Sequence, residues 1–471
     1  MADRRFGDVD IRGPARLPGL GWRGNVMRFF ADPFAGLTAL ARRPERLIAL
    51  ADRHPAFLCA FGPEHNHRLL TDRAAFDPFI TPLRAPPGSA FAVLVDNPFT
   101  TTGERWRCHR RAMVPPFHKK RVARYRDAIV DLIEAMLAEW RIGDVVDLPH
   151  ALQGLTLSAM MSVVFGLDVR HSRQETDAFR ALLTELLDAI GHLGAMFFPV
   201  DLPATPYRRM RRLAERFVAE VGALAERRRS EAAEDVLSDL IEAHRAAGAD
   251  DPRALVGEMF SLLTAGHETT YAALSWALLL LAAHPAVLGD LHDELRATLR
   301  GAAPTVAELG ALPLLDRVVR ESLRLLPTAP YGARITREET PFGGHVLPRG
   351  AVVIYSAHVT HHLPEVFDRP RVFDPERWHH AEPSPYAYLP FGAGPRTCLG
   401  AEFALMEMKL TLACLLQRFW PALVPGRRVD CRLRITLRPH PGLWVTLCRP
   451  GSRLPAPRLR GTIHDAVALA G

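Results

Sequence analysis

Apolar residues recur at helical spacing along most of this chain. In the clearest case, one face of a predicted amphipathic helix carries Val122, Tyr125, Ile129, Leu132, Ile133, Met136 and Trp140. Helical patterns continue as far as Leu326, and we predict breaks at Phe198-Pro199 and across residues 202–206, where prolines interrupt them. The pattern therefore predicts a protein built mainly from helices.

Strand patterns are short and scattered by comparison. They fall at residues 57–62, 332–336 and 351–355, with a last β region across residues 433–446. Residues 90–103 are predicted to form an irregular loop, and residues 106–121 a basic helix. The expected fold class is mainly α with small β-sheets (α+β).

One segment, Phe260–Ala283, is apolar over nearly its whole length and is long enough to cross a membrane. Its interior, however, carries His267, Glu268, Thr269 and Thr270. A carboxylate at membrane depth costs roughly 3 kcal/mol on insertion scales. We therefore predict a long central helix in the core of a soluble domain.

Composition places the 471-residue chain among ordinary globular proteins, with 48% hydrophobic and 24% charged residues. No Gly/Ser linker, repeat or low-complexity block divides the sequence, so one domain over residues 1–471 is expected. The net charge of +7 does not indicate nucleic acid, because the basic residues are dispersed and no nucleic-acid motif appears. Of the 59 basic residues only Lys119, Lys120 and Lys409 are lysines, which is typical of a codon bias.

The cysteines and the start of the chain indicate a cellular compartment. Six cysteines show no paired spacing, which favours a reducing environment without a disulfide framework. The first ten residues are charged and lack an apolar targeting segment. We expect a cytoplasmic protein with no membrane anchor.

Residues 391–400 read FGAGPRTCLG and place Cys398 directly before a predicted helix. Gly392 and Gly394 permit a tight turn and a close approach of the backbone to a flat ligand. The free N–H groups at the start of the helix favour the charged thiolate. This arrangement suits a thiolate ligand for a haem iron, whereas a cysteine without these neighbours would be a small buried apolar residue.

Other residues of the same loop fit that interpretation. The N–H groups of Leu399 and Gly400 would tune how much electron density the sulfur gives to iron. Arg396 can reach a haem propionate, and Phe391 can shield the sulfur from water.

The central helix carries a second motif, Ala265-Gly266-His267-Glu268-Thr269. Glycine and β-branched threonines form helices poorly, so their position in a core helix indicates a function. The Ala-Gly pair permits close approach and a local opening of the helix. A threonine hydroxyl at such an opening can hydrogen-bond dioxygen, and an adjacent acid can relay protons. The alternative is a kinked core helix with a buried Glu–Arg pair.

Two further pairs have helical spacing. Glu321 and Arg324 are three residues apart and close enough to pair, and Arg377 follows downstream in a Pro-Glu-Arg-Trp segment. Trp106 and Arg110 are four residues apart, and both can donate to a propionate carboxylate. An aromatic anchor beside a solvated arginine is the alternative for the second pair.

Together these motifs resemble the cytochrome P450 family. The pattern F-x-x-G-x-R-x-C-x-G is complete at residues 391–400, A-G-x-[DE]-T at residues 265–269, and E-x-x-R precedes P-E-R-W. The likeness covers about residues 15–450 and implies the cytochrome P450 fold, with its long central helix over the haem.

The resemblance implies a role for each motif residue. Cys398 would be the axial ligand of the haem b iron, and Thr269 and Glu268 the hydroxyl and the acid on the oxygen side. The haem-binding residues would be Trp106, Arg110, Arg334, Arg396, Phe391, Gly392, Gly394, Gly400, Ala265 and Gly266. A buried triad of Glu321, Arg324 and Arg377 would brace the cysteine loop.

The resemblance also implies a monooxygenase that uses O2 and acts on a lipophilic small molecule as a monomer. NAD(P)H electrons would arrive through a separate ferredoxin and ferredoxin reductase. A peroxygenase, or an isomerase or lyase of peroxides, remains an alternative that the intact Glu268-Thr269 pair disfavours. A haem-based sensor is a second alternative, which the lack of a signalling domain disfavours.

A basic stretch suggests where the electron donor would bind. It contains Arg105, Arg107, Arg110, Arg111, Lys119, Lys120 and Arg121, with Glu104 as its one acid. The resemblance places this stretch at the border of the proximal face near Cys398, where it would attract an acidic ferredoxin. Elsewhere, His361-His362 could suggest a metal site, but ordinary hydrogen-bonded loop histidines are favoured.

Overall fold

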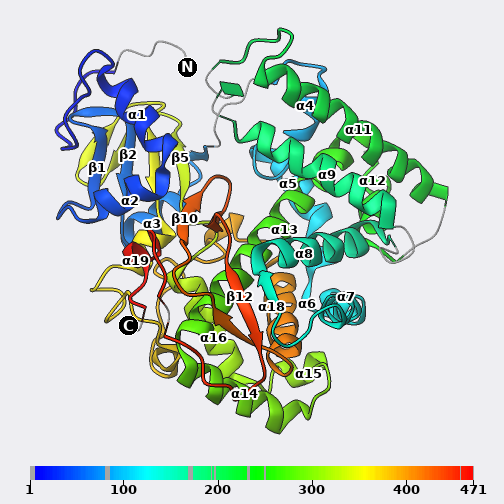
Figure 1. Cartoon of the computed structure of the whole chain (residues 1–471). Coiled ribbons are helices and arrows are strands. Elements are labelled where there is room, and N and C mark those ends of the chain that lie inside the picture. The colour runs from blue at the N-terminus through cyan, green and yellow to red at the C-terminus, as the bar shows by residue number, and fades with distance from the viewer. Residues whose placement is uncertain are drawn as a thin grey trace.

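The computed structural model describes residues 6–79, 85–167, 173–192, 194–195, 198–230, 234–248, 251–456 and 458–469. Within them, helices form most of the molecule and the strands gather in small sheets (Figure 1). The α-helices are α1 Gly21–Ala31, α2 Pro33–Ala41, α3 Pro63–Thr71, α4 Ala90–Leu94, α5 Gly103–Met113, α6 Lys119–Val122, α7 Arg126–Ala138, α8 Leu148–Phe165, α9 Arg173–Ile190, α11 Pro206–Ser230, α12 Val236–Ala246, α13 Pro252–Ala283, α14 Pro285–Leu299, α15 Val306–Leu309, α16 Pro313–Leu325, α17 Ala357–His361, α18 Ala401–Leu416 and α19 Ile463–Ala466.

The strands pair into sheets of the order β1-β2-β8-β5-β3, β4-β12-β9, β10-β11 and β6-β7 among the described residues. Their bounds are β1 Leu47–Ala51, β2 His54–Ala60, β3 Phe76–Pro78, β4 Val145–Asp147, β5 Gly332–Thr336, β6 Thr340–Phe342, β7 His345–Leu347, β8 Val352–Tyr355, β9 Trp420–Leu423, β10 Asp430–Leu433, β11 Leu437–His440 and β12 Trp444–Cys448. The strands predicted at 57–62, 332–336 and 351–355 are β2, β5 and β8. These three lie in one sheet, where β2 and β8 are parallel and β5 and β8 antiparallel. The fold class is mainly α with small sheets, as predicted.

Helix α13 forms the centre of the core. It contains the predicted segment Phe260–Ala283 and begins earlier, at Pro252, where the Asp251 side chain accepts a hydrogen bond from the Arg253 N–H. It packs against α8, α16, α18, β9 and β11. A Cβ at Gly266 would overlap the Met160 side chain, so this glycine lets α13 approach α8 closely.

Two local predictions were wrong. The basic helix predicted over residues 106–121 ends at Met113, because Pro115 and Pro116 lack the N–H groups that would continue it. A short 3-10 turn, Pro115–Phe117, then leads into α6. The loop predicted at 90–103 contains the helix α4, whose start is capped by the Ser89 hydroxyl.

Long apolar helices lie mainly in the interior. By length and composition, α8 could span a membrane among the described residues, and α13 with α14 passes the same test as a pair bent by 109°. Both α8 and α13 belong to the buried core and pack against each other. Core helices of this kind have the same composition as membrane spans, so the result is weak evidence for a membrane.

Candidate active site

The loop that carries Cys398 is closed by its own backbone. The Cys398 N–H donates to the Phe391 carbonyl over 2.9 Å, and half-buried Phe391 packs against the main hydrophobic core. Gly392 and Gly394 have φ values of 66° and 73°, which other residues rarely adopt. A Cβ at Gly394 would lie 2.7 Å from the Leu70 carbonyl oxygen. This glycine therefore allows the loop to pack on α3.

The thiol of Cys398 lies where α18 begins. The residue is accessible to solvent, but the protein atoms around it raise the pKa of its thiol by desolvation. A hydrogen bond from the Gly400 backbone and the positive charge of Arg110 oppose this rise in pKa. Both opposing groups favour the thiolate, which is the form that binds a metal.

Arg396 and Arg73 both contact the ring of the predicted site residue Trp106. The guanidinium of Arg396 lies 4.7 Å from the centre of the indole ring and that of Arg73 4.9 Å. Arg396 also donates to the carbonyls of Pro98 and Thr101 over 2.8 and 2.7 Å. Trp106 is thereby held in a stack that fixes the orientation of Arg396.

Three arginines, Arg73, Arg110 and Arg334, lie close enough to Arg396 for their charges to act on it, and the Asp77 carboxylate opposes them in part. Burial, followed by the charge of Arg334, lowers the pKa of Arg396 to about 10, and the charges of Arg73 and Arg110 also lower it. Among the described residues, none of Arg110, Arg334 and Arg396 forms a salt bridge with a carboxylate. A bound anion would offset the repulsion between these positive charges. The residues thus fit the two propionates of a haem, which Cys398 would ligate.

Sequence analysis missed Arg73 in this cluster. It follows α3 in a turn, outside any recognised motif, and it reaches Trp106 only through the tertiary fold. No local signal could have assigned it.

The oxygen motif lies within an uninterrupted stretch of α13. The Thr269 hydroxyl donates to the Ala265 carbonyl over 2.6 Å, and the Thr270 hydroxyl donates to the Gly266 carbonyl over 2.8 Å. Each threonine hydroxyl therefore donates its hydrogen bond to the carbonyl four residues earlier on the same helix.

The acid of the motif, Glu268, has a basic partner from the β region. The Glu268 carboxylate lies 3.8 Å from Arg438 of β11, which also donates to the Tyr271 hydroxyl over 3.0 Å. Burial raises the pKa of Glu268, and Arg438 opposes that rise. A carboxyl with a raised pKa holds a proton more readily than an exposed carboxyl and can pass it on. Its neighbour His267 is buried, which lowers its pKa to about 4 and keeps it neutral.

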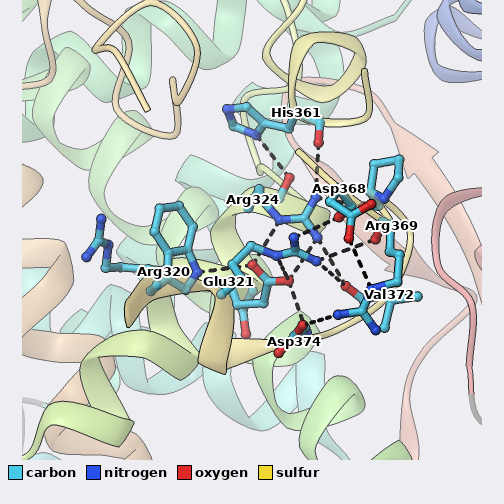
Figure 2. Close-up of polar contacts among 12 residues, drawn as sticks. Arg320, Glu321, Arg324, His361, Asp368, Arg369, Val372 and Asp374 are labelled. Carbon is cyan, nitrogen blue, oxygen red and sulfur yellow. Dashed lines mark hydrogen bonds and ion pairs between the residues drawn. The ribbon is translucent and has the colours of Figure 1, made fainter. Parts of the chain in front are cut away.

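Glu321, Arg324 and Arg377 come together as the sequence predicted. Arg324 donates to both carboxylate oxygens of Glu321 over 2.9 and 2.8 Å, and Arg377 donates to one of them over 3.1 Å (Figure 2). The Trp378 indole and the Asp374 backbone N–H complete the set of donors to Glu321. Glu321 and Arg324 are fully buried, so the pair is not a surface salt bridge.

His361 links this triad to the segment before the cysteine loop. Its Nδ1 contacts the Arg324 carbonyl at 2.9 Å, and its Nε2 accepts from the Leu389 N–H over 2.8 Å. His362 contacts the carbonyls of His358 and Ala466. No group of ligands that could hold a metal ion occurs among the described residues, and both histidines have ordinary hydrogen bonds as predicted.

A buried polar chain that the sequence did not predict ties the Trp106 helix to α13. His109 Nδ1 lies 2.7 Å from Glu258 of α13, and the second Glu258 oxygen lies 2.8 Å from His244 of α12. Glu258 is fully buried and His109 nearly so. Because His109 stands between Trp106 and Arg110 on α5, this contact holds α5 against the central helix.

The fold and these residues define a mainly helical protein that presents a cysteine and a cluster of arginines to a flat anionic ligand. The sequence model described as Cytochrome P450 matches residues 14–444. The chain belongs to the cytochrome P450 family and is a haem-thiolate monooxygenase.

Relatives and solved structures agree with this assignment. Cyclooctat-9-en-7-ol 5-monooxygenase of Streptomyces melanosporofaciens is 32% identical over 84% of this chain and 89% of its own. Cyclooctatin synthase of the same organism is 30% identical over 90% and 94%. The structure of cyanobacterial CYP120A1 with bound retinoic acid has a TM-score of 0.80 and 25% identity, covering 94% of this chain and 100% of its own.

Proposed function

We propose that this protein inserts one oxygen atom of O2 into a lipophilic small molecule, with electrons from a ferredoxin and its reductase. The balanced reaction takes R–H, O2, two electrons and two protons to R–OH and water. When bound, the haem supplies the oxygen activation. The observation that carries the proposal is the Cys398 loop beside the arginines around Trp106, because together they suit an iron-bound macrocycle with two carboxylates.

The roles of the protein residues follow from their positions. Cys398 would hold the iron, while Arg110, Arg334 and Arg396 would bind the propionates. On the oxygen side, Glu268 would accept a proton and pass it on, and the Thr269 hydroxyl would orient its delivery. A cytoplasmic monomer is part of the same proposal.

The printed names of relatives support the choice of substrate class. One Streptomyces relative is named for oxygenating cyclooctat-9-en-7-ol, and CYP120A1 was solved with retinoic acid. Both compounds are lipophilic, and a role in bacterial secondary metabolism is proposed on the first likeness.

The thiolate is tested by the spectrum of the reduced protein with carbon monoxide. Wild type should give the strongly red-shifted Soret band of thiolate-ligated haem, and Cys398→His should abolish it. Cys108→Ser, at an exposed cysteine on α5, should leave the band intact. A wild type that is loaded with haem but lacks the band would refute the proposal.

Oxygen activation is tested by coupling, the fraction of NADPH electrons recovered in product. Thr269→Ala should keep haem and substrate binding but divert electrons to hydrogen peroxide, because the hydroxyl that orients proton delivery is lost. Thr270→Ala, next to it on α13, is the matched control. Efficient turnover driven by hydrogen peroxide alone, with none from NADPH and redox partners, would instead favour the peroxygenase alternative.

A further inference from the structure

A pocket outside the motif residues lies between α9 and α11, helices that pack against each other (Figure 1). Its volume is about 670 Å³, which is in the range of small-molecule sites. Helix α9 forms one wall and α11 the other, and Arg434 from the connection between β10 and β11 completes the lining. The pocket is therefore large enough for part of a lipophilic substrate.

The charges that line this pocket do not balance. Its two carboxylates each have a partner already, because Glu185 lies 3.2 Å from Arg209 and Asp188 lies 3.2 Å from Arg434. A third arginine, Arg208, pairs with Asp201, which is not part of the lining. Two positive charges of α11 are left over.

These two charges belong to Arg212 and Arg216. Both are exposed and line the pocket, and neither forms an ion pair with a carboxylate among the described residues. Their spacing of four residues places them on the same face of α11, where like charges repel. Guanidinium groups so placed are suited to bind an anion, often through two hydrogen bonds each.

A second pocket neighbours this one and reaches the oxygen motif. A smaller pocket of about 120 Å³ is lined by Glu268, His267 and Thr436, and it shares Asp188 and Arg434 with the larger one. The Thr436 hydroxyl is buried without a hydrogen-bond partner, so this inner pocket is built for a polar occupant such as water. The Asp188–Arg434 pair stands between the two spaces.

We propose that the pocket between α9 and α11 binds the anionic head group of the substrate through Arg212 and Arg216, so that the substrate is a lipophilic acid. This inference rests on the proposed function. The apolar lining residues Ala189 and Leu213 would contact the start of the lipophilic body. The head group thereby fixes which end of the molecule stays away from the reacting carbon.

The test measures binding of lipophilic acids and their methyl esters to the haem-loaded protein by the shift of the Soret band. The panel includes retinoic acid and palmitic acid. In wild type, acids should bind at least tenfold more tightly than their esters, in keeping with charge-assisted hydrogen bonds of about 1.5–3 kcal/mol. Arg212→Gln/Arg216→Gln should lose this preference while ester affinity stays the same.

The matched control is Arg227→Gln/Arg245→Gln, which removes two exposed arginines outside the pocket. It should keep the preference for acids. If no acid in the panel binds wild type more tightly than its ester, or if the control loses the preference equally, the inference is overturned. The carbon monoxide spectrum separates this failure from a failure of the proposed function, because it does not depend on the substrate.

Discussion

Arg324 and Arg377 are buried or nearly so and both meet the Glu321 carboxylate. The arginines around Trp106 range from buried Arg334 to exposed Arg73, and none of them forms a salt bridge with a carboxylate among the described residues. Arg324 and Arg377 share the two oxygens of Glu321 with two further donors. Arg396, by contrast, is surrounded by Arg334, Arg73 and Arg110, and these charges lower its pKa. The first group stabilises the chain by itself, whereas the second is repulsive until an anion binds.

This difference separates structural residues from ligand-binding residues on physical grounds. A fully compensated buried charge is costly to break but offers nothing to a ligand. An uncompensated buried charge lowers the stability of the ligand-free protein. Binding of an oppositely charged ligand offsets this loss of stability. Removing one residue from each group should therefore have opposite effects on the haem-free protein.

The largest effect is expected at the triad. Glu321→Ala leaves two buried guanidiniums without a counter-ion and should lower the free energy of unfolding by about 3–5 kcal/mol. Protein without haem, or no soluble protein, is the expected result. Glu376→Ala, which removes an exposed carboxylate paired with Arg317, is the control and should cost less than about 1 kcal/mol. Normal haem content and melting temperature in Glu321→Ala would contradict the structural role.

A substitution in the second group should weaken haem binding without lowering the stability of the haem-free protein. Arg334→Gln should speed the transfer of haem to apomyoglobin by about tenfold or more, because a charge-assisted hydrogen bond is worth about 1.5–3 kcal/mol. The haem-free protein should melt at the same temperature or higher, since one repulsive charge is gone. Arg337→Gln, which alters an exposed arginine next to β5, should change neither quantity. An Arg334→Gln variant whose haem-free form is as unstable as Glu321→Ala would remove the distinction between the two groups.

The triad should also be sensitive to acid through His361. Burial lowers the pKa of His361 to about 3, so the unfolded chain, with a pKa near 6.5, takes up its proton first. Stability is therefore fully present above about pH 6.5 and falls as the pH drops towards 3, by up to about 1.4 kcal/mol per pH unit for this group. In His361→Gln, the slope of unfolding free energy against pH between 6 and 4 should decrease by about one proton. The exposed His380→Gln should keep the wild-type slope.

Most of the candidate site residues could be predicted from the sequence because each motif lies within a short segment. The glycines of the Cys398 loop, the Glu321–Arg324 spacing and the Ala265–Thr269 run each lie within a few residues. The long central helix could be predicted because Phe260–Ala283 is apolar and contains few polar residues. Pro115 and Pro116 are a local signal for the end of α5, and they outweigh the basic pattern that favours a helix as far as residue 121.

Partners that meet only through the tertiary fold could not be predicted. Arg73 reaches Trp106 from another element, Arg438 reaches Glu268 from β11, and His109 of α5 meets Glu258 of α13. No periodicity or spacing relates such residues. The same limit applies to the charges of α11, since the sequence does not say which arginines find carboxylates.

The basic stretch near α5 shows how much tertiary partners change a prediction. Arg105 pairs with Asp96 and Asp251, Arg107 with Glu104, and Arg121 with Asp239. The surface is therefore less basic than its sequence suggested. Among the described residues, the exposed cations of this stretch without an ion pair are Arg111, Lys119 and Lys120.

The smallest effect is expected from these remaining cations, because exposed charges act through screened, long-range attraction. If an acidic ferredoxin docks here, its reduction of the haem should slow severalfold as ionic strength rises from low to physiological values. Lys119→Glu/Lys120→Glu should slow it further while substrate affinity stays unchanged, and Arg227→Glu/Arg245→Glu, on α11 and α12, is the charge-matched control. A reduction rate that responds equally to both pairs would mean that net charge alone attracts the donor. A rate that responds to neither pair nor to salt would place the docking site of the donor elsewhere on the protein.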